Sequence, residues 1–331
     1  MGLNPKLLEV LQCPVCGGGL FQENESLICR SCKKLYPILN NIPDMRVYNS
    51  FTYYNEFNKV QACYEAGVHD IEATQSYEKR VINVYGTKTR LIVQDWAKTI
   101  EEMNNRPVVL DYGCGTGQIS RILRHYVPFL FAFDISSVSV YSNVKDNGVI
   151  GVIGNGFFLP FKDGAFNLVC INGVLHHIVD LKRAIEEISR VTKKLVYISE
   201  PVLGGQANFR RSFYYPILSQ KILYSLYILS YNAYSVMRRG CRFIDRIKRI
   251  PTRMLCKTVE ELPDCREGSK YERPIGSEII ETYFLANGFK RKKLQYVTNI
   301  DIPGTSSIKQ ILTKQLINDF IGTHFDLRLD R

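Results

Sequence analysis

The sequence lacks a hydrophobic run long enough to cross a membrane. Its longest uncharged stretch, residues 222–237, has 16 residues and is rich in tyrosine and serine, whereas a membrane-spanning helix needs about 20 mostly apolar residues. A secretory signal is also missing, because no long apolar run follows a basic region in the opening MGLNPKLLEV. We therefore expect a cytoplasmic protein, and a reducing compartment disfavours disulfides.

Internal repeats of the two-helix or blade type and low-complexity tracts are absent too, which argues against a solenoid or a propeller. The 331 residues are 45% hydrophobic and 23% charged, as in ordinary globular proteins with a sizeable core. The length indicates about two domains.

Acidic residues are scarce in one segment. Residues 201–256 contain ten Lys and Arg and one acid, Asp245, so that this segment carries +9 of the net charge of +11. A local basic patch points to phosphates, nucleic acid or an anionic membrane surface. A helix over residues 217–237 would separate an aliphatic stripe from a tyrosine stripe.

Three interpretations of residues 209–253 stay open. The segment can be a helix packed on the core with a solvated basic tail, or an interfacial helix that faces anionic lipid and makes the protein peripheral to a membrane. It can also bind RNA through stacked tyrosines and basic side chains. The aliphatic stripe favours a lid over a hydrophobic or lipid-linked substrate.

Four of the ten cysteines lie in the first 32 residues. Cys13 and Cys16 form one C-x2-C turn, and Cys29 and Cys32 form another after twelve intervening residues. Each turn presents two thiolates to one ion, and two turns complete a tetrahedron. Four thiolates leave no open position and no redox-type βαβ pattern surrounds them, so the spacing predicts a structural zinc site.

From Arg106 onward, short apolar runs alternate with helical segments, which predicts an α/β fold with a doubly wound, mostly parallel sheet. The expected strands cover 106–111, 129–134, 166–172 and 194–200, with helices at 118–126 and 181–192. Alternation resumes at Ser277, the expected N-cap of a helix that ends at Ala286 before Gly288. Closing strands are expected at 292–297 and 307–313.

The first of these strands runs into a turn in which glycine takes every second place. Gly113, Gly115 and Gly117 follow Asp111, and ordered glycines cost chain entropy. Something must therefore come close to this backbone. A strand, an acid and a glycine-rich turn into a helix are the geometry of a cofactor loop at the carboxyl edge of a parallel sheet.

This loop resembles the first motif, acid-x-G-x-G-x-G, of the class I S-adenosylmethionine-dependent methyltransferases. Downstream, FAFDIS and GNGFFLPFKDGAFNLVCINGVLHHI resemble further runs of that family. The likeness covers roughly residues 106–200 and is greatest to the subgroup that includes the quinone-biosynthesis C-methyltransferases. It implies a Rossmann-like fold, S-adenosylmethionine as cofactor, and methyl transfer by in-line displacement.

The resemblance also implies roles for single residues. Asp134 stands where the family has an acid that accepts from the ribose hydroxyls, and Asn155 stands where many members have the Asp that contacts the adenine amino group. Asn167 replaces an Asp whose role is chiefly structural. Gly117 could instead serve helix packing, and Asp134 could cap a helix from Ser136. The predicted cofactor-binding residues are Asp111, Gly113, Cys114, Gly115, Gly117, Asp134, Ile135, Asn155, Gly156 and Asn172.

Candidate general bases are His176, His177 and Glu200, which follow or end strands at the carboxyl edge of the sheet. Histidine suits this role because its pKa is near about 6.5. The LHHI string recurs in family members with different substrates, which favours a structural role. Tyr53 and Tyr54 are candidates for an aromatic lid over the cofactor or for core packing.

The cysteine segment, LLEVLQCPVCGGGL and LICRSCKKLYPILNNIPDM, resembles small zinc-ribbon proteins that partner and stabilise some methyltransferases. A similar module opens certain ribosomal-RNA guanine methyltransferases and helps to hold RNA. Basic residues in this segment are few and roughly balanced by acids, which is thin support for phosphate binding.

We therefore predict a methyltransferase that acts on a small-molecule or lipid-linked acceptor. Two alternatives stay open: an rRNA or tRNA methyltransferase, and a non-catalytic zinc-containing regulator that binds the cofactor. The regulator hypothesis predicts a damaged cofactor loop, and the intact glycine loop therefore disfavours it. The predicted units are a zinc-ribbon-like module (1–45), a helical linker and cofactor lid (46–105), the cofactor-binding core (106–200), a basic aromatic substrate lid (201–275), and a closing helix and strands (276–331).

Overall fold

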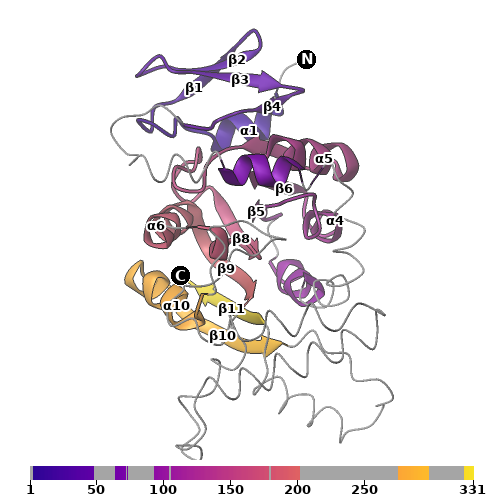
Figure 1. The fold of residues 1–331 in the computed structure, drawn as a ribbon, viewed down its shortest axis with the longest axis vertical. Coiled ribbons are helices and arrows are strands. Elements are labelled where there is room, and N and C mark those ends of the chain that lie inside the picture. Colours follow the sequence, from indigo (N-terminus) through magenta and orange to yellow (C-terminus); the bar gives the residue numbers. More distant parts are fainter. Residues whose placement is uncertain are drawn as a thin grey trace, which may run out of the picture.

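The computed structural model contains two β-sheets, which follow one another along the long axis of the molecule (Figure 1). It describes residues 3–47, 64–71, 73, 93–103, 106–178, 180–201, 275–297 and 324–331. The basic segment 209–253 and the lid candidates Tyr53 and Tyr54 lie outside the described residues. In the described parts of the chain, no helix combines the length and hydrophobicity that a bilayer crossing requires.

The N-terminal module consists of one short helix and a four-stranded antiparallel sheet. Helix α1 begins after Asn4, whose side chain accepts from the Lys6 N–H, with proline in its first turn. The elements are α1 (Pro5–Val10), β1 (Leu20–Glu23), β2 (Ser26–Cys29), β3 (Leu35–Leu39) and β4 (Ile42–Pro43).

The described strands of the second sheet number seven, in the order β10-β11-β9-β8-β5-β6-β7. Five are parallel, and the two C-terminal strands close the sheet in antiparallel pairing. The predicted fold class is confirmed. The strands are β5 (Val108–Tyr112), β6 (Phe129–Asp134), β7 (Ile150–Ile153), β8 (Phe166–Asn172), β9 (Thr192–Pro201), β10 (Lys290–Val297) and β11 (His324–Asp330).

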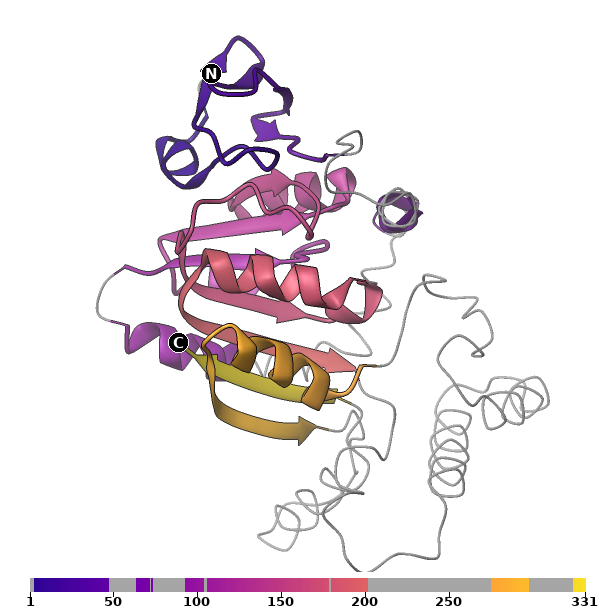
Figure 2. The same ribbon diagram turned by 90° about the vertical axis from the view of Figure 1, so that its left-hand side faces the viewer.

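Helices cover both faces of this sheet (Figures 1 and 2). On one face, α6 (Leu181–Val191) and α10 (Ser277–Ala286) lie side by side. On the other lie α4 (Ser120–Leu123), α5 (Ser137–Asn147) and the helical residues 93–101. Trp96 in the last segment is fully buried against the sheet.

Several local predictions need correction. Helix α4 is far shorter than the expected 118–126, because residues 118–119 and 124–126 form turns on either side of it. Ser277 is the first helical residue of α10 and Gly276 is its N-cap, without a capping side chain. Strands β7 and β11 were not expected. The expected strand at 307–313 lies outside the described residues.

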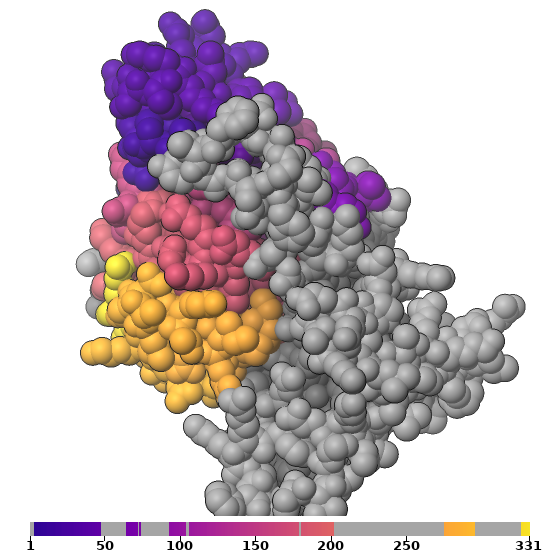
Figure 3. Space-filling model, turned by 60° about the vertical axis from the view of Figure 1, so that its left-hand side comes forward, coloured from indigo at the N-terminus to yellow at the C-terminus, as the bar shows by residue number. Residues whose placement is uncertain are grey.

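The N-terminal module packs directly on the edge of the large sheet (Figure 3). Asp44 forms a parallel β-bridge with Ile153, the last residue of the edge strand β7. The Met45 N–H donates to the Ile153 carbonyl at 2.7 Å. Leu11 bridges to Phe161, and buried side chains of both parts form one continuous cluster. The module and the methyltransferase-like sheet therefore share a hydrophobic core.

Candidate cofactor site and zinc centre

The glycine turn after β5 has a left-handed backbone at all three glycines, with φ of +70°, +48° and +94° at Gly113, Gly115 and Gly117. A Cβ atom at Gly113 would lie 2.3 Å from Val174, and one at Gly117 would lie 2.4 Å from Asn147. At Gly115, a Cβ atom would meet no atom of the described residues within 4 Å. The turn therefore packs on its neighbours at both ends and faces open space at Gly115, where a ligand can approach the backbone.

Asp134 joins this turn to the next strand of the sheet. Its carboxylate accepts from the Gly115 N–H and from the Ser136 N–H, each at 2.9 Å. Ser136, rather than Asp134, caps α5 through its hydroxyl. Because a carboxylate has about four acceptor positions, Asp134 retains room for ribose hydroxyls, and the site fits the predicted cofactor. The next carbonyl, of Ile135, accepts from the Arg46 guanidinium at 3.4 Å.

Asp111 lies beneath the turn and is fully buried. Its carboxylate accepts from the Ser120 hydroxyl at 2.6 Å, and that hydroxyl in turn accepts from Asn143. Asn147 donates to Asn143, so that a chain of polar groups connects α5, α4 and β5. Burial, with the nearby charge of Asp134, raises the pKa of Asp111 to about 7. Asp111 therefore anchors two helices below the turn.

The predicted adenine contact begins a loop that follows β7. The Asn155 side-chain oxygen accepts from the Phe157 N–H at 3.0 Å, which folds the loop on itself. At Gly156, a Cβ atom would collide with the Tyr112 hydroxyl at 2.0 Å, so glycine is needed for this close approach. Cys114 is buried in the glycine turn, which raises the pKa of its thiol well above the ordinary value. Asn172, half-buried, ends β8.

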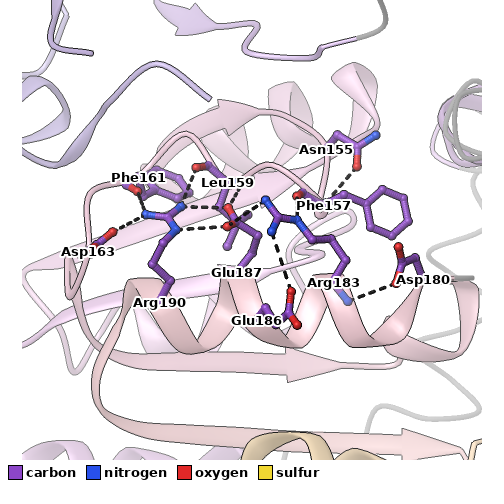
Figure 4. Close-up of polar contacts among 10 residues, drawn as sticks. All are labelled: Asn155, Phe157, Leu159, Phe161, Asp163, Asp180, Arg183, Glu186, Glu187 and Arg190. Atoms are coloured by element: carbon purple, nitrogen blue, oxygen red, sulfur yellow. Dashed lines mark hydrogen bonds and ion pairs between the residues drawn. The ribbon is translucent and has the colours of Figure 1, made fainter. Parts of the chain in front are cut away.

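Two side chains of α6 hold this loop, as Figure 4 shows. The Arg190 guanidinium donates to the carbonyls of Phe161 (2.7 Å) and Leu159 (3.0 Å). The Glu187 carboxylate accepts from the Leu159 N–H at 2.9 Å and pairs with Arg190 at 2.9 Å. The other side of the loop meets the N-terminal module, where the Gln12 N–H donates to the Pro160 carbonyl.

Glu200 and His176, two of the candidate bases, contact each other. His176 Nδ1 lies 2.7 Å from one Glu200 oxygen, and the other oxygen accepts from the N–H groups of Val174 and Leu175. Burial alone would raise the pKa of Glu200, but these hydrogen bonds and the His176 charge lower it below its usual value. Glu200 therefore holds the turn after β8 in place, a positioning role.

His177, the third candidate, lies next to the helical residues 64–71, which fall within the expected helical linker (46–105). Burial, with His176 nearby, lowers the pKa of His177, and its Nδ1 is 3.5 Å from Glu65 Oε2. Residues 64–71 lie beyond the arrowhead ends of the parallel strands (Figure 2). Asp70 ties them to α5, since it accepts from the Ser136 hydroxyl and the Val138 N–H. The four-residue Glu65–His69 spacing was the signal available in the sequence.

The four N-terminal cysteines converge as predicted. Cys13 and Cys32 Sγ atoms are 3.7 Å apart, those of Cys16 and Cys29 are 3.5 Å apart, and all four lie within 4.8 Å of one another. Zinc–sulfur bonds of about 2.3 Å place the sulfurs of a tetrahedral site about 3.8 Å apart. The cluster therefore fits a structural zinc ion with four thiolate ligands.

Comparison with known families agrees with both parts. Residues 110–198 match the family described as "Methyltransferase domain", and residues 4–41 match "Trm112p-like protein". The module is 49% identical over 45 residues (13% of this chain, 75% of the relative) to a UPF0434 protein of Methylobacillus flagellatus. Residues 110–198 of the chain thus carry a methyltransferase domain, and a Trm112p-like module lies on its N-terminal side.

Relatives of the methyltransferase domain differ in what they do. Demethylmenaquinone methyltransferase of Corynebacterium glutamicum is 35% identical over 101 residues, or 30% of this chain and 44% of the relative. The human arginine-hydroxylase NDUFAF5 is 35% identical over 103 residues, or 30% of each chain. This chain thus spans less than half of these relatives. A solved Haloferax volcanii complex of the Trm112 methyltransferase activator with a methyltransferase has a TM-score of 0.49 at 13% identity, covering 79% of this chain and 96% of that one.

Proposed function

We propose that this protein transfers a methyl group from S-adenosylmethionine to a small-molecule or lipid-linked acceptor. The observation that carries the proposal is the opening at Gly115 beside the Asp134 carboxylate. Among the described residues, a Cβ atom at Gly115 would meet nothing within 4 Å, and the Asp134 carboxylate accepts a hydrogen bond from the Gly115 N–H. A ligand with ribose hydroxyls can therefore approach bare backbone next to an acceptor for those hydroxyls.

The cofactor supplies both the activated methyl group and the leaving group. The chain has to orient it and keep water out. Gly115 and Asp134 would hold the ribose and methionine portions, and Asn155 and Gly156 the adenine. Glu200 and His176 position the turn that carries His177, so that His177 is the remaining candidate base of the three.

The acceptor class rests on sequence likeness. The demethylmenaquinone methyltransferase of C. glutamicum is named for a lipid-linked quinone and shares 35% identity over 101 residues with this chain. The apolar stripe expected in residues 217–237 would suit a hydrophobic acceptor. The likeness to an arginine-hydroxylase is why the acceptor and the reaction need a direct test.

Calorimetric titration with S-adenosylmethionine tests the cofactor site. We expect Gly115→Val, which fills the opening, and Asp134→Ala, which removes the carboxylate, each to weaken binding by roughly tenfold or more. Gly288→Val is the matched glycine control, because Gly288 also has a left-handed backbone (φ +85°) and a Cβ atom there meets none of the described residues within 4 Å. Asp146→Ala, at an exposed site on α5, controls for the lost charge. Unchanged affinity in both site variants, or no binding by the natural chain, contradicts the proposal.

The acceptor is tested with methyl-labelled cofactor and cell extract. We expect label in the lipid or small-molecule fraction, and none there with Gly115→Val. An RNA acceptor is the second candidate, supported by the Trm112p-like module through its resemblance to modules that hold RNA. Label in RNA, with RNA binding that weakens steeply as salt is added, would favour that candidate over the first.

A further inference from the structure

A second group of metal-ligating side chains lies apart from the cysteine cluster. It consists of Glu65 and His69 in the helical residues 64–71 and of His177 in the turn after β8. Each offers one ligand atom, and these atoms lie within 4.8 Å of one another. We propose that this histidine–glutamate cluster binds one divalent first-row transition metal ion, such as Zn²⁺, Fe²⁺ or Mn²⁺.

The separations within the cluster match those of a metal site. Glu65 Oε2 is 3.3 Å from His69 Nε2 and 3.5 Å from His177 Nδ1. Metal–ligand bonds of about 2.0–2.2 Å place neighbouring ligand atoms about 3.0–3.5 Å apart. The two imidazole rings meet edge to face, with centroids 5.2 Å apart, so that neither ring stacks on the other. All three ligand atoms therefore lie close enough to approach one ion.

Two anchored elements supply the ligands. Glu65 and His69 are four residues apart and share one helical face, and Asp70 fastens that helical segment to Ser136 at 2.6 Å. His177 lies in the turn whose N–H groups Glu200 holds. Each of the two ligand-bearing elements thus has a support of its own, as metal sites require of their surroundings.

The donor set indicates the kind of ion and of site. Two imidazoles and one carboxylate suit Zn²⁺, Fe²⁺ or Mn²⁺ better than Ca²⁺. The Glu65 residue is only 5% exposed, and a cation compensates for burying its charge. Three protein ligands leave at least one position for water or a substrate oxygen, as in catalytic sites. The cysteine cluster, with four ligands, leaves none.

The cluster shares the edge of the sheet with the glycine turn. Val174, against which Gly113 packs, lies three residues before His177. If the proposed methyl transfer holds, a bound metal would lower the pKa of an acceptor oxygen near the methyl donor. His177 would then act as a metal ligand in place of a base. The effect on the acceptor oxygen rests on the proposed function, whereas metal binding by the cluster does not.

The test uses the 331-residue chain with its cysteine cluster loaded with zinc, dialysed against Co²⁺ and then counted by elemental analysis. We expect one cobalt in addition to one zinc per chain, without the thiolate-to-cobalt charge-transfer absorption that cysteine ligation produces. His69→Ala and His177→Ala should weaken cobalt binding by at least roughly 100-fold, since even outer-shell changes cost about 10–100-fold. The exposed His125 provides the matched control, His125→Ala.

Absence of cobalt beyond the zinc, or unchanged cobalt binding in both variants, overturns the inference. Retained zinc and circular dichroism verify that the variants fold. If the variants do not fold, X-ray absorption of the cobalt-loaded natural chain identifies the cobalt ligands. Imidazole ligands support the histidine–glutamate cluster, and sulfur ligands refute it. S-adenosylmethionine binding is measured on the same samples, so that failure of the metal site is distinguished from failure of the cofactor site.

Discussion

At the scale of single residues, Asp111 makes the stability of the folded protein depend on pH. Its carboxyl group is fully buried, and its pKa of about 7 in the folded protein exceeds the value of about 3.9 expected in the unfolded chain. The folded state therefore binds the proton more tightly. The stability associated with protonated Asp111 is fully present below about pH 4 and is lost as the pH rises through about 7.

We predict that Asp111→Asn removes this dependence. The amide cannot ionise and still accepts from the Ser120 hydroxyl, which lies 2.6 Å from the carboxylate. The difference in free energy of unfolding between variant and natural protein should shift in the variant's favour from pH 4 to pH 7 and then level off. Urea unfolding across this range measures it, with Asp146→Asn as the exposed control. A difference that stays constant with pH would contradict the assignment.

The structure adds contacts of the predicted site residues that the sequence does not reveal. The sequence placed Asp111, Gly117 and Glu200 among the cofactor or catalytic residues. In the structure the Asp111 carboxylate accepts a hydrogen bond from the Ser120 hydroxyl, and Gly117 leaves space for side chains of α5. The Glu200 carboxylate accepts from two backbone N–H groups and contacts His176. Spacing along the chain cannot reveal such contacts, because each depends on which residues from other elements fill the neighbouring space.

At the scale of elements, α6 organises the loop that carries Asn155. Three hydrogen bonds join this helix to the backbone of residues 159–161. Arg190 donates two of them, and Glu187 accepts the third. Removing the guanidinium would leave two carbonyls and a carboxylate without these partners, and each buried polar group that loses its partner costs about 1–3 kcal/mol.

Arg190→Met should therefore lower the free energy of unfolding by about 2–3 kcal/mol and weaken S-adenosylmethionine binding. Chemical denaturation and calorimetry provide the two measurements. Arg183→Met is the matched control on the same helix, because Arg183 is more exposed and makes longer contacts, 3.3 Å to the Phe157 carbonyl and 3.5 Å to Glu187. Equal losses in the two variants would argue against a special role of Arg190.

Strand prediction succeeded where apolar runs were long. β6 and β8 match the expected ranges to the residue. β7 was missed because IGVI is short and contains glycine. β11 was not expected, although Asp326 and Arg328 alternate with leucines as in a strand with one solvated face. Both polar residues are instead buried. Trp96 donates to Asp326, and Arg328 pairs with Asp95, and this pairing of polar groups makes their burial possible.

At the scale of the whole molecule, the N-terminal module and the methyltransferase domain share a core. Buried side chains of the module, including Leu7, Cys13 and Tyr36, belong to one cluster with Phe131 and Phe161 of the domain. Main-chain hydrogen bonds also cross the junction, from Gln12 to Pro160 and from Lys162 to Val10. Loss of zinc should therefore destabilise the methyltransferase domain as well as the module.

We predict that removal of zinc lowers the melting temperature of the whole chain in one cooperative transition. The shift should be several degrees or more, since about 1 kcal/mol moves the melting temperature by about 2–4 °C in chains of this order of size, and a structural zinc contributes more than that. Differential scanning calorimetry with and without chelator measures it, and added zinc should reverse it. A separate module transition that leaves the main transition unmoved would show that the two parts are independent.

The sequence by itself determined the fold class, the glycine turn and the pairing of the two C-x2-C turns, because each is a pattern of neighbours along the chain. Only the tertiary structure decided that the module shares its core with the domain and that Glu65 and His69 meet His177, more than a hundred residues away. The physical reason is that the parallel strands end at one edge of the sheet, where turns and a covering helix from distant segments converge.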